Sequence, residues 1–164
     1  MWLMASFTDK PITVFRYDPS RSQAVPTQWL TAEVNTLIVD GYKGYDSACK
    51  DYCIQRLGCW AHARRKFVDA QKLQPKASAP AHAPYLSPVG KGKTGKADQA
   101  IAFIQKLYLI EKQIKDDPPD QRYIIRQQQA KPIIDKIKDW LDKSLLHVPP
   151  KTALGTALQY LHNQ

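Results

Sequence analysis

Short hydrophobic stretches separated by polar turns run through the first 60 residues, a pattern typical of β-strands alternating with short helices. Residues 2–7 and 12–17 predict two strands of a hairpin, because residues 8–11 between them are polar and include a proline that interrupts strand pairing. The apolar run 37–39 predicts a buried strand, and residues 54–57 predict another short strand. Together these segments indicate a small mixed sheet.

Helical patterns fall between these strands and then dominate the chain. Residues 26–34, 45–52 and 60–73 predict helices, so the first part of the chain is predicted to be α/β. Residues 74–96 are rich in Pro, Ala, Ser, Gly and Lys without a hydrophobic period and predict a flexible loop. Residues 97–164 return to helical spacing. The predicted domains are therefore 1–73, a loop at 74–96, and a helical region at 97–164.

Within the helical region, prolines and apolar stripes predict where the helices start and stop. Asp116 to Pro119 ends a first helix, and a second runs from about Asp120 to the stop at Val148-Pro149-Pro150. Pro132 is expected to kink this second helix or to divide it. A final helix over residues 151–164 carries apolar residues on one face. Such stripes favour packing over ligand binding.

Charge adds a prediction about partners. The chain has 24 Lys and Arg against 15 Asp and Glu, a formal net charge of +9. This excess favours a polyanionic partner, nucleic acid first and an anionic membrane second, because basic side chains neutralise phosphates and release counterions. A cut after His82 leaves +4 before it and +5 after it, which predicts a distributed excess. A soluble basic protein without such a partner is the alternative.

Cysteine content and hydropathy indicate the compartment. Three cysteines, no apolar segment behind the N-terminus and no run of about 18 apolar residues argue against secretion and membrane insertion. A cytoplasmic, reducing compartment is predicted. The first residues already have the pattern of a strand, so the chain is expected to begin inside a fold.

Asp40 is the first candidate for chemistry, because it directly follows the predicted strand 37–39. A carboxylate in that position is held rigidly and is exposed, as metal-dependent phosphoryl transfer requires of the ligands of Mg²⁺. The competing interpretation is an ordinary Asp-Gly turn.

The second candidate is the block Gly58-Cys-Trp-Ala-His-Ala-Arg-Arg-Lys-Phe67, which opens a predicted helix. Arg64, Arg65 and Lys66 are suited to binding DNA phosphates without reading base sequence. A solvated helix face is the alternative. Cys59 and His62 are interpreted as residues that fix the turn into the helix.

Metal binding by thiols and stacking by aromatic residues are two further hypotheses. Cys49, Cys53, Cys59 and His62 lie within fourteen residues, but without a Cys-x-x-Cys pair the spacing disfavours zinc and favours free thiols. The aromatic side chains near the basic block could stack on an unpaired base, although core packing is the favoured interpretation. These aromatic residues are Tyr42, Tyr45 and Trp60.

Four blocks of the sequence, in this order and spacing, resemble the central region of insertion sequence 66 transposases. The Cys-Trp-Ala-His block is the most specific of them. The four blocks are residues 15–22, 39–45, 58–67 and 148–155, so that the resemblance covers essentially the whole chain.

The resemblance implies a partial ribonuclease-H-like mixed sheet followed by an α-helical insertion region. It also implies an Asp, Asp, Glu triad that uses Mg²⁺ or Mn²⁺ to cut DNA and transfer strands, with DNA ends, target DNA and other transposition proteins or copies as partners. Asp40 matches the second Asp. The first Asp is expected before Trp2 and the Glu after Gln164, which implies truncation at both ends and no activity for this chain alone. The alternative is a noncatalytic DNA-binding or transposase-assembly module.

Overall fold

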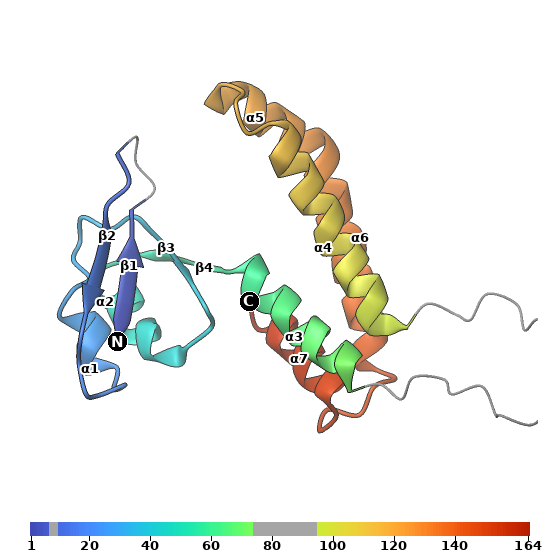
Figure 1. Ribbon diagram of the computed structural model, residues 1–164, viewed down its shortest axis with the longest axis horizontal. Helices are drawn as coiled ribbons and strands as arrows, with labels where there is room; N and C mark the ends of the chain where they lie inside the picture. The colour runs from blue at the N-terminus through green and yellow to red at the C-terminus, as the bar shows by residue number, and fades with distance from the viewer. Residues whose placement is uncertain (7–9, 74–94) are drawn as a thin grey trace, which may run out of the picture. The chain divides into compact units, whose positions relative to one another are not determined.

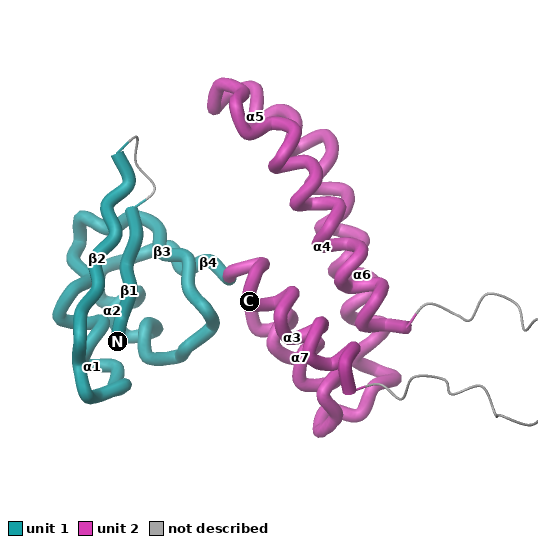
Figure 2. Tube along the Cα trace, viewed as in Figure 1, with its two compact units in different colours: residues 1–58 teal, residues 59–164 magenta. Residues whose placement is uncertain are grey.

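The computed structural model describes residues 1–6, 10–73 and 95–164 and divides them into two compact units, Met1–Gly58 and Cys59–Gln164 (Figure 2). The first unit holds two small sheets with short helices, and the described elements of the second are all helices (Figure 1). The protein is thus a mixed fold in which helices predominate, which confirms the α/β prediction at this coarse level. The predicted division into 1–73, 74–96 and 97–164 stays a prediction, and most of the predicted loop lies outside the described residues.

The first sheet is the predicted hairpin. Strand β1 (Trp2–Ala5) pairs antiparallel with β2 (Thr13–Arg16), and Leu3 lies opposite Phe15. Because side chains alternate between the faces of a strand, Leu3 and Phe15 point to one face, where they are 61% and 65% exposed. Met4 and the side chains beside it point to the other face. One face of this hairpin is therefore apolar and open to solvent.

The second sheet is a parallel pair joined by a helical crossover. Strand β3 (Thr36–Val39) pairs with β4 (Gln55–Gly58). The crossover holds a 3₁₀ turn, η1 (Lys43–Tyr45), and helix α2 (Asp46–Asp51). Parallel neighbours require such a crossover, because a tight turn can only return the chain antiparallel. Its small core consists of Leu30, Ala48, Cys49 and Ile54.

One predicted helix of this unit is wrong in its bounds. Helix α1 covers Ala24–Thr27, whereas residues 26–34 were predicted to be helical. Pro26 is buried inside this single turn, and the chain leaves it so that Leu30 enters the core of the parallel pair. Burial of an apolar side chain outweighs the weak helix propensity of this segment, which contains two threonines and a valine.

The helical unit is built from α3, which follows β4 directly, and a long antiparallel pair of helices. Helices α4 and α6 run side by side, and α3 packs against both α4 and α7 (Figure 1). Phe67, Ile104 and Leu158 from three different helices are at most 1% exposed in the main cluster. The helices are α3 (Trp60–Lys72), α4 (Lys96–Gln113), α5 (Pro119–Ile125), α6 (Lys131–Leu145) and α7 (Ala153–His162).

The break expected at Pro132 takes the form of a π-helical segment. Helices α5 and α6 are joined without a gap by η2 (Arg126–Ala130), a π segment that ends two residues before Pro132. Proline cannot donate the intrahelical hydrogen bond and its ring crowds the preceding turn, and a wider turn relieves both problems. The predicted division is thus observed as a π segment that separates α5 from α6.

The block at 148–155 forms the turn between α6 and α7. The Thr152 hydroxyl caps α7 by accepting a hydrogen bond from the Gly155 N–H at 3.0 Å. A Cβ atom at Gly155 would clash with the Pro149 carbonyl oxygen and would lie 2.8 Å from the Pro150 Cα atom. Only glycine fits here. Within the described ranges, no helix combines the length and apolar character needed to cross a membrane.

Candidate functional site

Asp40 lies at the carboxyl end of β3, where the chain turns out of the parallel pair. Its Oδ1 accepts a hydrogen bond from the Tyr42 N–H at 3.1 Å, and Gly41 between them adopts a φ of 86°. This is an Asx turn that requires a residue tolerant of positive φ, a role suited to glycine. Asp40 is exposed. Both interpretations of the dipeptide therefore describe the same geometry, a turn that presents a carboxylate at a strand end.

Aromatic side chains surround the turn at Asp40. Tyr42 and Tyr45 meet edge to face with ring centroids 5.7 Å apart, and the Trp2 ring lies 6.2 Å and 6.3 Å from them. The Tyr42 hydroxyl donates to the Arg21 carbonyl oxygen. Burial, followed by the nearby Asp40 carboxylate, raises the pKa of Tyr45. These contacts fix the turn and place negative charge next to a phenol that stays neutral.

A divalent metal needs more ligands than the described residues bring together. Residues 1–6, 10–73 and 95–164 contain no group of three or more His, Cys, Asp or Glu side chains arranged to hold a metal ion. Asp40 has the hard carboxylate oxygen that Mg²⁺ prefers, but a two-metal centre requires several such groups. The described residues do not by themselves form the expected metal site.

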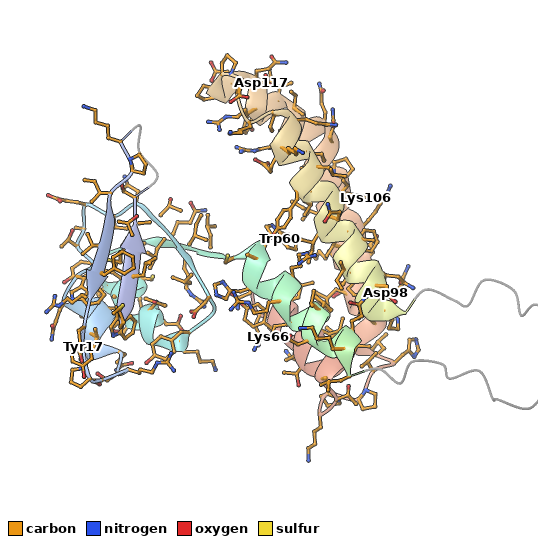
Figure 3. All side chains as sticks on the ribbon, in the orientation of Figure 1. Tyr17, Trp60, Lys66, Asp98, Lys106 and Asp117 are labelled. Atoms are coloured by element: carbon orange, nitrogen blue, oxygen red, sulfur yellow. The ribbon has the colours of Figure 1, made fainter. Side chains whose placement is uncertain are left out.

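Arg64, Arg65 and Lys66 occupy consecutive positions on α3, so their side chains point in different directions around the helix axis. Lys66 reaches over α7, where its Nζ lies 5.7 Å from the centroid of the Tyr160 ring. Arg64 lies on the α4 side, where it opposes the effect of burial, which raises the pKa of Tyr108. Arg65 is exposed between them. The three cations are therefore spread around α3 between its α4 side and its α7 side, and we call them the α3 band; Lys66 is labelled in Figure 3.

Cys59, Trp60 and His62 form the start of α3. The Cys59 carbonyl oxygen accepts hydrogen bonds from the N–H groups of His62 and Ala63, both at 3.1 Å. The Trp60 ring packs against both hydrophobic clusters of the helical unit. His62 Nδ1 is buried and has no hydrogen-bond partner among the described residues. The most specific block of the sequence is thus a structural junction between β4 and the helical core.

The cysteines are free thiols in different surroundings. Cys49 is buried in the core of the parallel pair, and burial raises the pKa of its thiol. Cys53 is exposed and Cys59 is half-buried. A thiol held inside a hydrophobic core is an inert packing group, since the thiolate is the form that binds metal.

The excess positive charge belongs to one unit. Met1–Gly58 contains 6 basic and 6 acidic residues and is neutral, whereas Cys59–Gln164 contains 18 basic and 9 acidic residues and carries the whole net charge of +9. The cut after His82 divides the charge almost equally because it leaves the basic residues of α3 in the first half, whereas the boundary at Gly58 places them in the helical unit.

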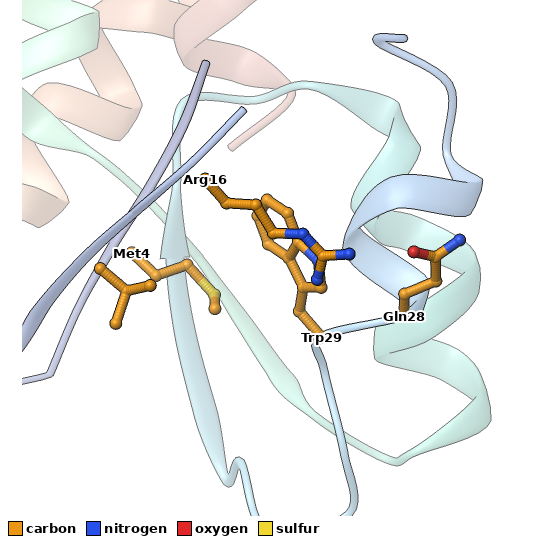
Figure 4. Close-up of a pocket in the computed structure, with 5 residues that line it drawn as sticks. Met4, Arg16, Gln28 and Trp29 are labelled. Carbon is orange, nitrogen blue, oxygen red and sulfur yellow. The ribbon is translucent and has the colours of Figure 1, made fainter. Parts of the chain in front are cut away.

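A cavity that the sequence did not predict lies between the hairpin and the segment after α1. It has a volume of about 300 Å³ and is lined by an indole, a guanidinium, a carboxamide and two apolar side chains. The Arg16 guanidinium lies over the Trp29 ring at 5.0 Å from its centroid (Figure 4). The lining residues are Met4, Val14, Arg16, Gln28 and Trp29.

Comparison with known proteins identifies the family. Residues 1–164 match the Transposase IS66 family. Two proteins of Sinorhizobium fredii are similar in sequence: the uncharacterized protein y4qI is 26% identical over 160 residues, and the uncharacterized protein y4hP is 28% identical over 141 residues. These alignments cover 93% and 83% of this chain but 26% and 24% of the relatives. No solved structure matches the chain.

Because the match spans every residue, the chain belongs to the IS66 transposase family, which confirms the resemblance seen in the sequence blocks. The chain spans about a quarter of the length of the curated relatives that it matches.

Proposed function

We propose that this chain forms part of a transposase that cleaves DNA and transfers strands during transposition of an insertion sequence. Asp40 is then the second of three catalytic carboxylates and supplies one ligand to Mg²⁺ or Mn²⁺. The observation that supports this role is the position of Asp40, which is exposed at the carboxyl end of a parallel strand in a chain of this family. The remaining ligands belong to parts of the complete protein beyond these 164 residues.

The proposed fold of the catalytic part is a ribonuclease-H-like mixed sheet. Within the described residues, β1 pairs with β2 alone and β3 pairs with β4 alone. An antiparallel hairpin and a parallel pair become one mixed sheet when a further strand pairs with β1 on one side and β3 on the other. Such a strand would form hydrogen bonds with the backbone N–H and C=O groups at the edges of β1 and β3.

The catalytic proposal is tested in the complete transposase by replacing Asp40 with Asn. We expect Mg²⁺-dependent nicking and strand transfer to fall to background. The Asn amide has no negative charge and therefore binds Mg²⁺ much more weakly than the Asp carboxylate does. The matched control is Asp51→Asn, an exposed carboxylate at the end of α2 in the same unit, which is expected to leave activity unchanged. Full activity of the Asp40→Asn enzyme overturns the assignment.

The 164-residue chain alone is proposed to be inactive. Purified chain is incubated with supercoiled DNA and Mg²⁺ or Mn²⁺, and we expect no nicking above that of the Asp40→Asn variant. Nicking that depends on both metal and Asp40 contradicts this part of the proposal.

The positive band on α3 is proposed to bind the DNA backbone. Combined replacement of Arg64, Arg65 and Lys66 by Ala is expected to weaken binding and to reduce the slope of log affinity against log salt by up to about 3. The control replaces three exposed lysines of α6, which changes the net charge by the same amount on another helix. These lysines are Lys136, Lys138 and Lys143. Equal losses in the two variants mean that binding follows net charge and not the α3 band.

The second candidate is a noncatalytic DNA-binding or assembly module, favoured by the concentration of the net charge of +9 in the helical unit. It predicts that the complete protein keeps transposition activity when Asp40 is replaced but loses it when the α3 band is neutralised. The two candidates therefore give opposite results for the same Asp40→Asn enzyme.

A further inference from the structure

The cavity beside the hairpin has the chemistry of a site for a planar, hydrogen-bonding ring. The Arg16 guanidinium lies over the Trp29 indole, so the cavity presents a planar cation and an aromatic ring together (Figure 4). Guanidinium planes and aromatic rings are the two surfaces on which proteins stack unpaired bases. A volume of about 300 Å³ is at the small end of ligand sites.

A polar side chain at the rim of this cavity is available for hydrogen bonding. Trp29 Nε1 itself is buried and has no hydrogen-bond partner in the described residues, so we assign the recognition of polar groups to the rim and use the indole N–H only as a reporter. The exposed Gln28 carboxamide offers both a donor and an acceptor at the rim. A base edge, which carries carbonyl oxygens, ring nitrogens and amino groups, complements this set.

A second indole, that of Trp2, holds the ring of Trp29 in place. Trp2 meets it edge to face with centroids 5.6 Å apart and an interplanar angle of 86°. Trp2 is in turn fixed by its Nε1 hydrogen bond to the Ser20 carbonyl oxygen at 3.3 Å. The stacking surface is therefore preorganised, which lowers the entropic cost of binding a ring.

From these contacts we propose that the cavity lined by Arg16, Gln28 and Trp29 binds a single unpaired nucleobase of DNA. The inference rests on the proposed function only for the choice of DNA as the source of the base. The unit around the cavity has no net charge although Arg16 is a cation, so we assign recognition of the ring to the cavity and the main attraction for the phosphate backbone to the helical unit. Backbone attraction belongs to the helical unit, and the two contributions are separable by salt.

The indole N–H resonance of Trp29 reports directly on this site. The 164-residue chain labelled with ¹⁵N gives one such signal for each of its four tryptophans, and loss of a signal in Trp29→Phe assigns it. The probes are a short single-stranded oligonucleotide, the same strand with every base removed, the corresponding duplex, and deoxynucleoside monophosphates. We expect the intact single strand to shift the Trp29 signal, whereas the abasic strand and the duplex leave it in place.

The monophosphates distinguish a base that belongs to a DNA strand from a base of a free nucleotide. They are expected to produce the same shift as the single strand but only at higher concentration, because they lack neighbouring phosphates that the helical unit attracts. A shift with monophosphates and none with the single strand overturns DNA as the source. An abasic strand that shifts the signal as far as the intact strand, or four probes without any shift, overturns the site itself.

A charge-conserving pair of variants isolates the stacking contribution. Arg16→Lys keeps the charge but loses the planar surface, and we expect single-strand binding to weaken roughly tenfold with an unchanged salt slope. Arg21→Lys is the control, an exposed arginine of the same unit that does not line the cavity, and it is expected to bind like the parent chain. Equal affinity of the Arg16→Lys variant and the parent contradicts the proposal.

Base binding by the Asp40→Asn chain tests the cavity separately from the catalytic proposal. It is expected to give the same Trp29 shift as the parent, since Asp40 does not line the cavity. Failure of base binding with intact dependence of catalysis on Asp40, or the reverse, then identifies which of the two proposals is wrong.

Discussion

The two units of this chain differ in how far they complete their own cores. In the helical unit, Phe67 is fully buried between three helices, whereas Phe15 in the hairpin is 65% exposed beside Leu3. The helical unit carries all of the net charge and the mixed unit carries none. The helical unit therefore buries its large apolar side chains within itself and carries a charged surface. The mixed unit leaves apolar side chains and the Asp40 carboxylate exposed, where further elements or partners can contact them.

The largest expected effect contrasts the two phenylalanines. Phe67→Ala is expected to destabilise the helical unit by about 3–5 kcal/mol, because it removes a fully buried ring from a packed core. Phe15→Ala is the matched change in the mixed unit and is expected to cost about 0.5 kcal/mol or less. Urea unfolding followed by circular dichroism measures both. A large cost for Phe15→Ala reveals that the open face of the hairpin is covered in solution.

A smaller loss of stability is expected when a side chain is added at Gly155, next to the turn between α6 and α7. Gly155→Ala introduces a methyl group against the backbone of Pro149 and Pro150, which cannot move aside as a side chain can. We expect a loss of about 1–3 kcal/mol in the free energy of unfolding. Thr156→Ala, at the next and exposed position of α7, serves as the control. Equal stability of the Gly155→Ala chain and the parent shows that the turn has another conformation.

The smallest effect concerns pH and the pairing of α4 with η2. The Arg126 guanidinium bonds to both oxygens of Glu111, at 2.8 Å and 2.7 Å, and this hydrogen bonding lowers the pKa of the carboxyl group. The stabilisation is complete above the ordinary carboxyl pKa and is lost as pH falls through the lowered value. Because both side chains are about half exposed, we expect Glu111→Gln to cost at most about 1 kcal/mol at neutral pH.

The control for this pair is Glu33→Gln in the mixed unit, since Glu33 has no ion-pair partner in the described part of the chain. Thermal unfolding is compared across the acidic range for both variants and the parent. The Glu111→Gln chain is expected to lose its deficit at low pH, where the parent carboxylate is also protonated. A deficit that persists there points to lost packing instead of a lost ion pair.

Sequence patterns predicted the elements that depend on interactions between residues close together in the chain. The alternation of apolar residues gave the hairpin, and the step from Cys59 into a helix was visible in the sequence. Helix α1 was misplaced because burial of Leu30 depends on α2 and on Ile54, which lie about 20 residues further along the chain. The assignment of the net charge to one unit was not visible in the sequence for a related reason, since the boundary between units at Gly58 is a property of packing.

Of the candidate site, the position of Asp40 at a strand end was predicted correctly, and its catalytic role stays a prediction. The cavity was missed because Arg16 and Trp29 are brought together only by the pairing of β2 with β1 above the segment after α1. The alternation of side chains along the two strands was the available signal. It places Met4, Val14 and Arg16 on one face of the hairpin.

The π segment before Pro132 sets the rotational phase of everything that follows it. Ile125, Ala130, Ile133 and Ile137 all face the same hydrophobic cluster, yet the first two are five residues apart, a step that an α-helical turn does not accommodate. A uniform α-helix of the same length would rotate α6 by about 100° relative to α5 and turn its isoleucines away from the cluster, whereas the wider π turn absorbs the extra residue and keeps them facing it. Deleting one of the three glutamines is therefore expected to give a uniform helix with the same buried face, because Ile125 and Ala130 would then be four residues apart.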